Sequence, residues 1–318
     1  MKIFFASSSS IALEVFKEIV KHYEVVGVLT LPDKPKGRGQ KLSQNVIKVQ
    51  AIAKNIKVFD PLILDDNILN SIRDLNPDLM LVFSYGKIFK KEFLDIFPKG
   101  CINVHPSLLP KYRGVSPIQS AILNGDCVSG ITIQSMALEM DSGNILVQRN
   151  FKIRSCDTSY DISNLVSSLS PALVLEALEK ISKGSKGFLG IPQKASEATF
   201  CSFFKKESGF IDFNLSAFEI KNRINACNPW PLVRASLDYS DIIFHRADFL
   251  KIDLYKERKI GEIVDFDSKR GLFVNTGKGI LLLLEVQRPG RRVLDFKSFY
   301  NGSRQLIGQV FSSIGGIY

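Results

Sequence analysis

Residues 100–125 read GCINVHPSLLPKYRGVSPIQSAILNG and contain the most informative local pattern of the chain. Asn103 and His105 lie two residues apart at the end of a short apolar run, so on a β-strand both side chains project from the same face. Pro106 ends this strand, and together with Pro110 it excludes a helix or a central strand in the residues that follow. A carboxamide and a titratable imidazole are therefore expected close together, next to a loop whose conformation two prolines restrict.

A helix start follows the loop. Ser116 has the character of an N-cap, Pro117 suits the first helical position, and Gln119 is the capping-box partner. Gly125 is the expected helix stop. The order of strand, polar pair, loop and helix places the polar pair at the carboxyl end of a strand, where open α/β sheets bind ligands.

Short apolar runs alternate with helical patterns through the first half of the chain. This alternation predicts an α/β fold with a mostly parallel sheet and right-handed crossovers. No GxGxxG motif follows the first strand, so the pattern does not indicate a bound dinucleotide or ATP. We expect strands at residues 2–6, 24–30, 78–83, 101–105, 130–138 and 144–153, and helices at residues 11–21, 45–55, 66–75, 89–97 and 158–182.

The pattern changes in the last third of the chain. Short β-like runs with closely spaced turns follow one helix, at residues 216–226, and predict a small β-barrel. A glycine-rich helix stop and a loose composition precede them and predict a linker. We therefore expect one domain over residues 1–185, a linker over 186–203 and a second domain over 204–318.

Charge and cysteine content restrict the class of protein. The 318 residues carry a formal net charge of +10 and are 45% hydrophobic, which is the composition of a soluble globular protein that favours a polyanionic partner such as nucleic acid. The five cysteines are widely spaced and form no CxxC pair. They indicate neither a disulfide framework nor a zinc site, and they fit a reducing cytoplasm. No apolar stretch is long enough to span a bilayer.

Residues 31–48 form a basic segment that contains glycine and proline but no apolar periodicity. Such a segment predicts a mobile loop whose cations suit phosphate groups. A solvated surface loop is the alternative, and it is the commoner explanation of a charge run. The cations are Lys34, Lys36, Arg38, Lys41 and Lys48, against the single acidic residue Asp33.

Two motifs resemble a known family. The string NVHPSLLP at residues 103–110 is followed by Tyr112-Arg113-Gly114, and MDSG stands downstream at residues 140–143. Together they resemble the signature of the 10-formyltetrahydrofolate-dependent formyltransferases. The resemblance covers nearly the whole chain and implies a Rossmann-like, mostly parallel sheet with a C-terminal OB-like β-barrel. It also implies formyl transfer to an amine, with 10-formyltetrahydrofolate as co-substrate and no metal.

The resemblance implies that Asn103, His105 and Asp141 are catalytic. Asn103 would donate its amide N–H to a developing oxyanion, and His105 would stabilise the same charge or relay a proton. Asp141 would orient His105, although an aspartate in such a turn most often caps its own backbone. The implied folate-binding residues are Ser84, Tyr85, Gly86, Ser107, Leu108, Leu109 and Pro110. Without the resemblance, the first three are simply a strand-to-helix turn.

Within this family, the basic segment and the basic barrel favour methionyl-initiator tRNA as the acceptor. From residue 204 onward the chain has 18 Lys and Arg against 13 Asp and Glu. The chain departs from the family at Phe213, where tryptophan is usual, and at Phe203, where lysine is usual. The implied tRNA-binding residues are Lys34, Lys36, Arg38, Lys41 and Lys206, with Lys205 as a further substitute for the lysine missing at position 203.

Two other functions compete with this interpretation. A sugar-nucleotide amine formyltransferase would have no use for the basic segment, and a non-catalytic RNA-binding relative would not need the three catalytic side chains. The sequence leaves open how initiator tRNA is distinguished from elongator tRNA and which protonation state His105 holds. We expect a cytoplasmic enzyme that works as a monomer, with tRNA and folate as partners and no membrane association.

Overall fold

The computed structural model describes residues 1–36, 41–183, 190–252, 254–303 and 305–313. The chain divides into two compact units, and each is described here by itself. Unit 1 comprises Met1–Pro117, Ser129–Phe151 and Ser163–Cys201, and unit 2 comprises Ile118–Val128, Lys152–Ile162 and the residues from Ser202 onward. The two boundaries of the expected linker stay a prediction; residues 190–201, expected in the linker, belong to unit 1.

Unit 1 is built on a seven-stranded sheet with the order β10-β9-β7-β6-β1-β2-β5. Its central strands run parallel, from β7 through β6, β1 and β2 to β5, and β9 is antiparallel to β7. The predicted mostly parallel sheet is therefore confirmed. The strands are β1 (Lys2–Ala6), β2 (Glu24–Leu29), β5 (Val58–Phe59), β6 (Leu79–Val82), β7 (Cys101–His105), β9 (Val128–Ser135) and β10 (Ile145–Lys152).

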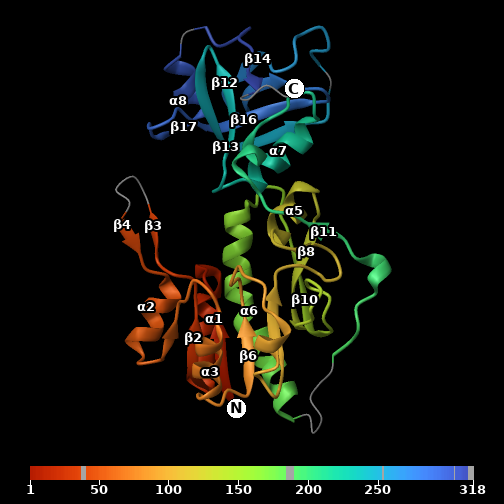
Figure 1. Cartoon of the computed structure of the whole chain (residues 1–318). Coiled ribbons are helices and arrows are strands. Elements are labelled where there is room, and N and C mark those ends of the chain that lie inside the picture. Colours follow the sequence, from red (N-terminus) through yellow and green to blue (C-terminus); the bar gives the residue numbers. More distant parts are fainter. Residues whose placement is uncertain (37–40, 184–189, 253, 304, 314–318) are drawn as a thin grey trace. The chain divides into compact units, whose positions relative to one another are not determined.

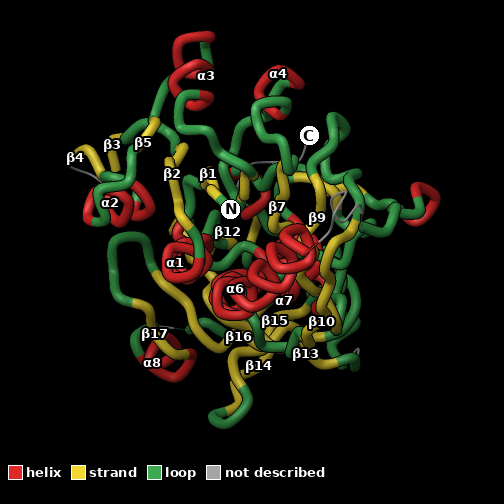
Figure 2. Tube along the Cα trace, turned by 90° about the horizontal axis from the view of Figure 1, so that it is seen from below, coloured by secondary structure: helices red, strands yellow, loops and turns green. Residues whose placement is uncertain are grey.

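Helices cover both faces of this sheet, because successive residues of a buried strand point to opposite sides. Phe5 packs against Phe16 of α1 with ring centroids 5.4 Å apart, while Phe4 lies in a cluster with Ile72 of α3 and Phe93 of α4. Figure 2 shows α1 and α6 on one side of the strands, and α3 and α4 on the other. The helices of unit 1 are α1 (Leu13–His22, after the 3-10 turn Ser10–Ala12), α2 (Val46–Ala53), α3 (Asp66–Arg73), α4 (Lys91–Leu94) and most of α6 (Ser159–Lys183). Almost all of α5 (Pro117–Leu123) belongs to unit 2.

The helix expected at residues 89–97 is much shorter, since α4 covers only Lys91–Leu94. Phe89, Phe93 and Phe97 have the four-residue spacing of a helix face. Their rings instead form a buried row, with centroids 4.7 Å apart for Phe89 and Phe93 and 5.8 Å apart for Phe93 and Phe97. The spacing therefore reflects aromatic packing around one helical turn rather than a continuous helix.

The basic segment is not the irregular loop that its composition predicts. β3 (Lys34–Lys36) pairs antiparallel with β4 (Lys41–Ser43), and this hairpin extends from unit 1 beside α2 (Figure 1). Lys48, expected among the free cations of the segment, lies on α2 and forms ion pairs with Asp33 at 2.8 Å and Asp60 at 2.7 Å. Its charge is therefore already compensated.

Unit 2 contains an antiparallel barrel preceded by α7 (Ala217–Ala226), whose start is a capping box formed by Ser216 and Glu219. The strands follow the order β14-β15-β16-β13-β12-β18, and β17 pairs with β16. The remaining elements are β12 (Val233–Leu237), β13 (Ser240–Leu250), β14 (Ile263–Asp267), β15 (Gly271–Asn275), β16 (Ile280–Gln287), β17 (Val293–Asp295), α8 (Phe296–Asn301) and β18 (Ser312–Ser313). This antiparallel architecture after one helix agrees with the predicted OB-like barrel.

Residues 308–313 close the barrel by pairing with both edges of the sheet. Ile263 of β14 donates its N–H to Gln309 O at 2.8 Å, and Phe311 N donates to Gly261 O at 2.8 Å. The same segment then continues as β18, in which Ser313 pairs with Ala235 of β12. No edge of this sheet is left for pairing with another chain at these positions.

Three phenylalanine rings fill the barrel interior beside this closing segment. The Phe311 ring stacks on Phe213 with centroids 5.9 Å apart and meets Phe244 edge-on at 5.2 Å. All three side chains are buried. Phe213, which stands where tryptophan is usual in the family that the sequence resembles, is therefore a core residue of the barrel.

Replacing Phe311 by alanine is expected to lower the free energy of unfolding of unit 2 by about 3–5 kcal/mol, because the cavity would lie between two rings that cannot close over it. Trp230, the only tryptophan of the chain, lies in unit 2, so its fluorescence during urea titration reports on this unit. Phe203→Ala is the matched control, since the Phe203 side chain is 70% exposed, and its effect should stay within about 0.5 kcal/mol. Equal effects of the two substitutions would contradict the assigned core.

Candidate active site

The polar pair of β7 meets a carboxylate at the carboxyl end of the sheet. Asn103 Nδ2 lies 3.4 Å from Asp141 Oδ1, and His105 Nδ1 lies 3.5 Å from Asp141 Oδ2. Asp141 stands in the turn between β9 and β10. The structure thus brings together the three side chains for which the sequence implied a catalytic role.

Two further groups hold the carboxylate of Asp141. Gln134 of β9 donates its Nε2–H to Oδ1 at 2.7 Å, and the backbone N–H of Gly114 donates to Oδ2 at 2.9 Å. Asp141 itself has a φ of +51°, a left-handed conformation that costs a non-glycine residue about 1–2 kcal/mol. The surrounding bonds therefore impose both the position and the direction of this carboxylate.

Gly114 is required at its position. It has a φ of +119°, and a Cβ on this residue would lie 2.3 Å from the carbonyl oxygen of Cys201. The close approach follows from the pairing of β8 (Arg113–Gly114) with β11 (Phe200–Cys201). A residue with a side chain would push apart the two strands and move the N–H that binds Asp141.

His105 is 3% exposed, and the hydrogen bond at its far nitrogen fixes its tautomer. Its Nε2 lies 2.8 Å from the carbonyl oxygen of Tyr112, which only accepts, so Nε2 carries the proton. Burial lowers the pKa of His105 below its ordinary value, while the charge of Asp141 and the Tyr112 carbonyl act in the opposite direction. With burial dominant, the imidazole is neutral at pH 7 and turns the lone pair of Nδ1 toward Asp141.

Hydrogen bonds from both sides shape the loop after β7. The buried Thr132 hydroxyl donates to Ser107 O at 2.7 Å and accepts from Leu109 N at 3.2 Å. On the other side, Thr199 O accepts from Arg113 N at 2.8 Å. These contacts from β9 and from the segment before β11 hold the loop in one conformation.

The side chains of the predicted folate-binding loop are largely engaged within the protein. The Ser107 hydroxyl donates to Lys111 O at 2.6 Å, and the Leu109 side chain is 3% exposed. Leu108 and Pro110 are half-buried. Any ligand contact by Ser107 and Leu109 would therefore have to come from backbone groups.

The second predicted folate-binding loop lies next to the first, because Val82 of β6 pairs with Asn103 of β7. Ser84 and Gly86 are exposed and have φ values of +55° and +89°, so the chain turns sharply as it leaves β6. Tyr85 points into the core, where its ring stacks on Phe89 at 5.1 Å. Burial raises the pKa of the Tyr85 hydroxyl to about 12. Its ring supports the loop from below.

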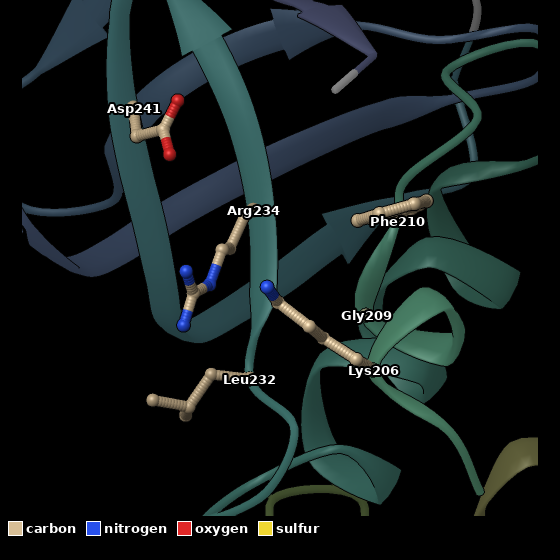
Figure 3. Close-up of a pocket in the computed structure, with 6 residues that line it drawn as sticks. All are labelled: Lys206, Gly209, Phe210, Leu232, Arg234 and Asp241. Carbon is tan, nitrogen blue, oxygen red and sulfur yellow. The ribbon is translucent and has the colours of Figure 1, made fainter. Parts of the chain in front are cut away.

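The predicted tRNA-binding residues fall in both units. Lys34 and Lys36 lie in β3 and Lys41 in β4, while Arg38 lies outside the described residues. Lys206 lies in the 3-10 turn η3 (Lys206–Gly209) of unit 2. Figure 3 shows its side chain and that of Arg234 extending into one pocket, of about 140 Å³, which Gly209, Phe210, Leu232 and Asp241 also line.

Sequence reasoning missed Gln134 and Gln193, which bind Asp141, and Thr132, which binds the loop after β7. Thr132 and Gln134 alternate on β9, so a period-2 pattern of polar residues in an apolar strand was an available signal. Gln193 had no such signal and was assigned to the linker. In the structure its Nε2 donates to the carbonyl of Asp141 at 2.8 Å, so this part of the predicted linker is part of the site.

Neither a membrane span nor a metal site is visible in the part of the chain that the structure describes. None of its helices combines the length and the apolar character needed to cross a bilayer. Within the same residues, no three His, Cys, Asp or Glu side chains are grouped so that they could hold a metal ion.

Comparison with known proteins identifies the family. Residues 2–178 match the model of the formyl transferase family, and residues 204–304 match that of its C-terminal domain. A methionyl-tRNA formyltransferase of Borreliella afzelii (strain PKo) is 92% identical over 318 residues, which are 100% of both chains, and one of Borrelia turicatae (strain 91E135) is 64% identical over 98% of this chain and 100% of the relative.

Solved structures share the fold at low sequence identity. WlaRD, a sugar 3N-formyl transferase crystallised with dTDP and 5-N-formyl-THF, is 21% identical, with a TM-score of 0.64 over 92% of this chain and 99% of that chain. HypX from Aquifex aeolicus in complex with tetrahydrofolic acid is 17% identical, with a TM-score of 0.61 over 94% of this chain and 46% of that chain. The two family models and the full-length relatives together show that this chain belongs to the methionyl-tRNA formyltransferase family.

Proposed function

We propose that this protein transfers the formyl group of 10-formyltetrahydrofolate to the free amino group of methionyl-initiator tRNA. The convergence of Asn103 and His105 on Asp141 at the carboxyl end of the sheet supports this reaction most directly. The names of the full-length relatives support the acceptor. A sugar-nucleotide acceptor is not favoured, because the sugar 3N-formyl transferase WlaRD is 21% identical to this chain, whereas the two full-length relatives are 92% and 64% identical. A non-catalytic RNA-binding function is not favoured, because it would not need Asn103, His105 and Asp141 to converge.

The reaction requires no protein nucleophile, because the incoming amine attacks the formyl carbon directly. The carbonyl oxygen then becomes an oxyanion, and the Asn103 amide is placed to donate a hydrogen bond to it. Asn103 keeps a second N–H besides the one directed at Asp141. Fixed donors of this kind lower the barrier because they need no reorganisation during the reaction.

The proton of the attacking amine must move for the transfer to finish. A bond forms between the amine nitrogen and the formyl carbon, the bond between that carbon and N10 of the folate breaks, and N10 takes up a proton. The lone pair of His105 Nδ1, beside the carboxylate of Asp141, receives the proton from the amine and returns it to N10. The bond from Nε2 to Tyr112 O keeps the ring in the orientation that this relay needs.

The folate would bind at the two neighbouring loops, residues 84–86 and 107–110. The side chains of Tyr85, Ser107 and Leu109 are buried, whereas Ser84 and Gly86 are exposed. We therefore expect the turn at residues 84–86 and the half-buried Leu108 and Pro110 to contact the flat heterocycle of the folate. Folates bound to WlaRD and HypX, which share this fold, support a folate-derived donor.

Positive charge supports the tRNA part of the proposal. The β3–β4 hairpin carries Lys34, Lys36 and Lys41, and Arg38, which lies outside the described residues, falls between them in the sequence. In unit 2, the pocket with Lys206 and Arg234 adjoins a second hollow that shares Asp241 and contains Arg288 and Arg291. Clustered cations of this kind bind phosphates through release of counterions. The proposal places the enzyme in the cytoplasm and requires one copy of the chain.

The acceptor is tested by single-turnover formylation with 10-formyltetrahydrofolate and three acceptors in parallel: methionyl-initiator tRNA, methionyl-elongator tRNA and free methionine. We expect rapid transfer to the initiator alone. Neutralising Lys34, Lys36, Arg38 and Lys41 together should weaken tRNA binding and make it less dependent on salt. If the protein binds folate but transfers no formyl group to any of the three, methionyl-tRNA is not its acceptor, and an amino-sugar nucleotide becomes the candidate acceptor.

Asn103→Ala should lower kcat by about a hundredfold or more, because one oxyanion donor is lost. Thermal unfolding should stay close to that of the unchanged protein, since Asn103 is only half-buried. Asn67→Ala, at an exposed position of α3, is the matched control and should leave kcat unchanged. Near-normal turnover of Asn103→Ala would remove this residue from the mechanism.

His105 should titrate below the ordinary histidine value of about 6.5, because its burial disfavours the charged form. The chain contains three histidines, so NMR of histidine-labelled protein gives three ring signals, and His105→Gln assigns the one of interest. Between the pKa of His105 in the folded chain and its higher pKa in the unfolded chain, only the unfolded chain is protonated at this residue. Acidification below about pH 6.5 therefore reduces the free energy of unfolding through this group. A midpoint above 6.5 would mean that the charge of Asp141 outweighs burial.

A further inference from the structure

Gln193 joins the two backbone segments that hold His105 and Asp141. Its Nε2 donates to the carbonyl oxygens of Asp141 at 2.8 Å and Gly143 at 2.7 Å, at the two ends of one turn. Its Oε1 accepts from Nε of Arg113 at 3.1 Å and from Nη2 at 2.9 Å. The side-chain amide thus uses both its donor and its acceptor sides within the protein.

The partner on the other side, Arg113, stands between two groups of the site. The residue before it, Tyr112, supplies the carbonyl that binds His105 Nε2, and the residue after it, Gly114, supplies the N–H that binds Asp141 Oδ2. Arg113 is 4% exposed. A bond to its guanidinium therefore acts on the backbone that fixes both catalytic side chains.

The turn that Gln193 holds is tightly constrained. Asp141 has a left-handed backbone, and a Cβ at position 143 would lie 1.7 Å from Ser135 O, so the turn packs directly on the end of β9. Gln193 Nε2 also lies 3.3 Å from Gln134 Oε1. The two N–H groups of Gln193 have closer acceptors in Asp141 O and Gly143 O, so this is the weakest of its contacts. Gln134 is oriented more firmly by its own Nε2, which donates to Asp141 Oδ1 at 2.7 Å.

Backbone hydrogen bonds hold the chain on both sides of Gln193, so the position of this residue is fixed. Ile191 and Ile145 exchange two backbone hydrogen bonds, of 2.8 and 2.9 Å. Further along, β11 pairs with β8, which contains Arg113. The segment therefore forms part of the wall of the site.

We propose that Gln193 is a positioning residue for formyl transfer: by bridging Arg113 and the turn at Asp141, it sets the direction in which the Asp141 carboxylate meets Asn103 and His105. The inference rests on the proposed function for its effect on the rate. Its effect on the geometry of His105 does not depend on the substrate.

Gln193→Glu tests the donor side of the amide. The glutamate keeps the length of the side chain and an oxygen for Arg113, but it replaces the N–H groups by an oxygen that faces two carbonyls and Gln134. We expect kcat to fall at least tenfold, while KM for folate and for tRNA changes less than threefold. Gln50→Glu, which makes the same change of charge on α2, should leave kcat unchanged.

Gln193→Met separates positioning from charge, since it keeps the length and adds no charge. In this variant the ring signals of His105 should shift in the NMR spectrum while those of His22 and His245 stay in place, and kcat should fall by a similar factor. Unchanged kcat in both variants, or a fall in thermal stability with no change at His105, would overturn the inference. Absence of transfer by the unchanged protein would refute the proposed function instead, and the His105 signals would still decide the role of Gln193.

Discussion

The carboxylate of Asp141 is the point on which the site depends. It accepts hydrogen bonds from Gln134 on β9 and from the backbone of Gly114, and it faces Asn103 and His105 from β7. A carboxylate that is largely withdrawn from water, as this one is with 13% of its side chain exposed, is stable only when such donors replace the water that it loses. The bonds that stabilise this carboxylate within the protein therefore also fix the geometry of the proposed catalytic site.

Much of the fold follows from local sequence patterns. β7 has the bounds that its apolar run and Pro106 predict, and Asn103 and His105 both face Asp141, as a spacing of two residues requires. The parallel sheet follows from the alternation of strands and helices. These features depend on neighbours in the sequence, and such information is available without a structure.

Other features depend on contacts between distant segments, and for these the sequence carries no local signal. Asp141 could be singled out only through a family motif, because an aspartate in a turn is ordinary. Gln193 looked like linker composition, although it completes the site through Arg113. The hairpin of β3 and β4 joins neighbouring segments and was missed for a different reason, since its Lys-rich and Pro-containing strands lack the alternation that identifies a half-buried strand.

The closure of the barrel has a consequence for how unit 2 acquires its structure. Ala235 of β12 pairs with Ser313, and Ile263 of β14 pairs with Gln309. Both edge strands therefore pair only when residues 308–313 are in place. Pairings between residues so far apart in sequence carry a large entropy of loop closure and slow the folding reaction. Unit 2 should accordingly fold in one late cooperative step. A chain that stops before residue 308 would leave the edges of β12 and β14 unpaired, and unpaired strand edges promote aggregation.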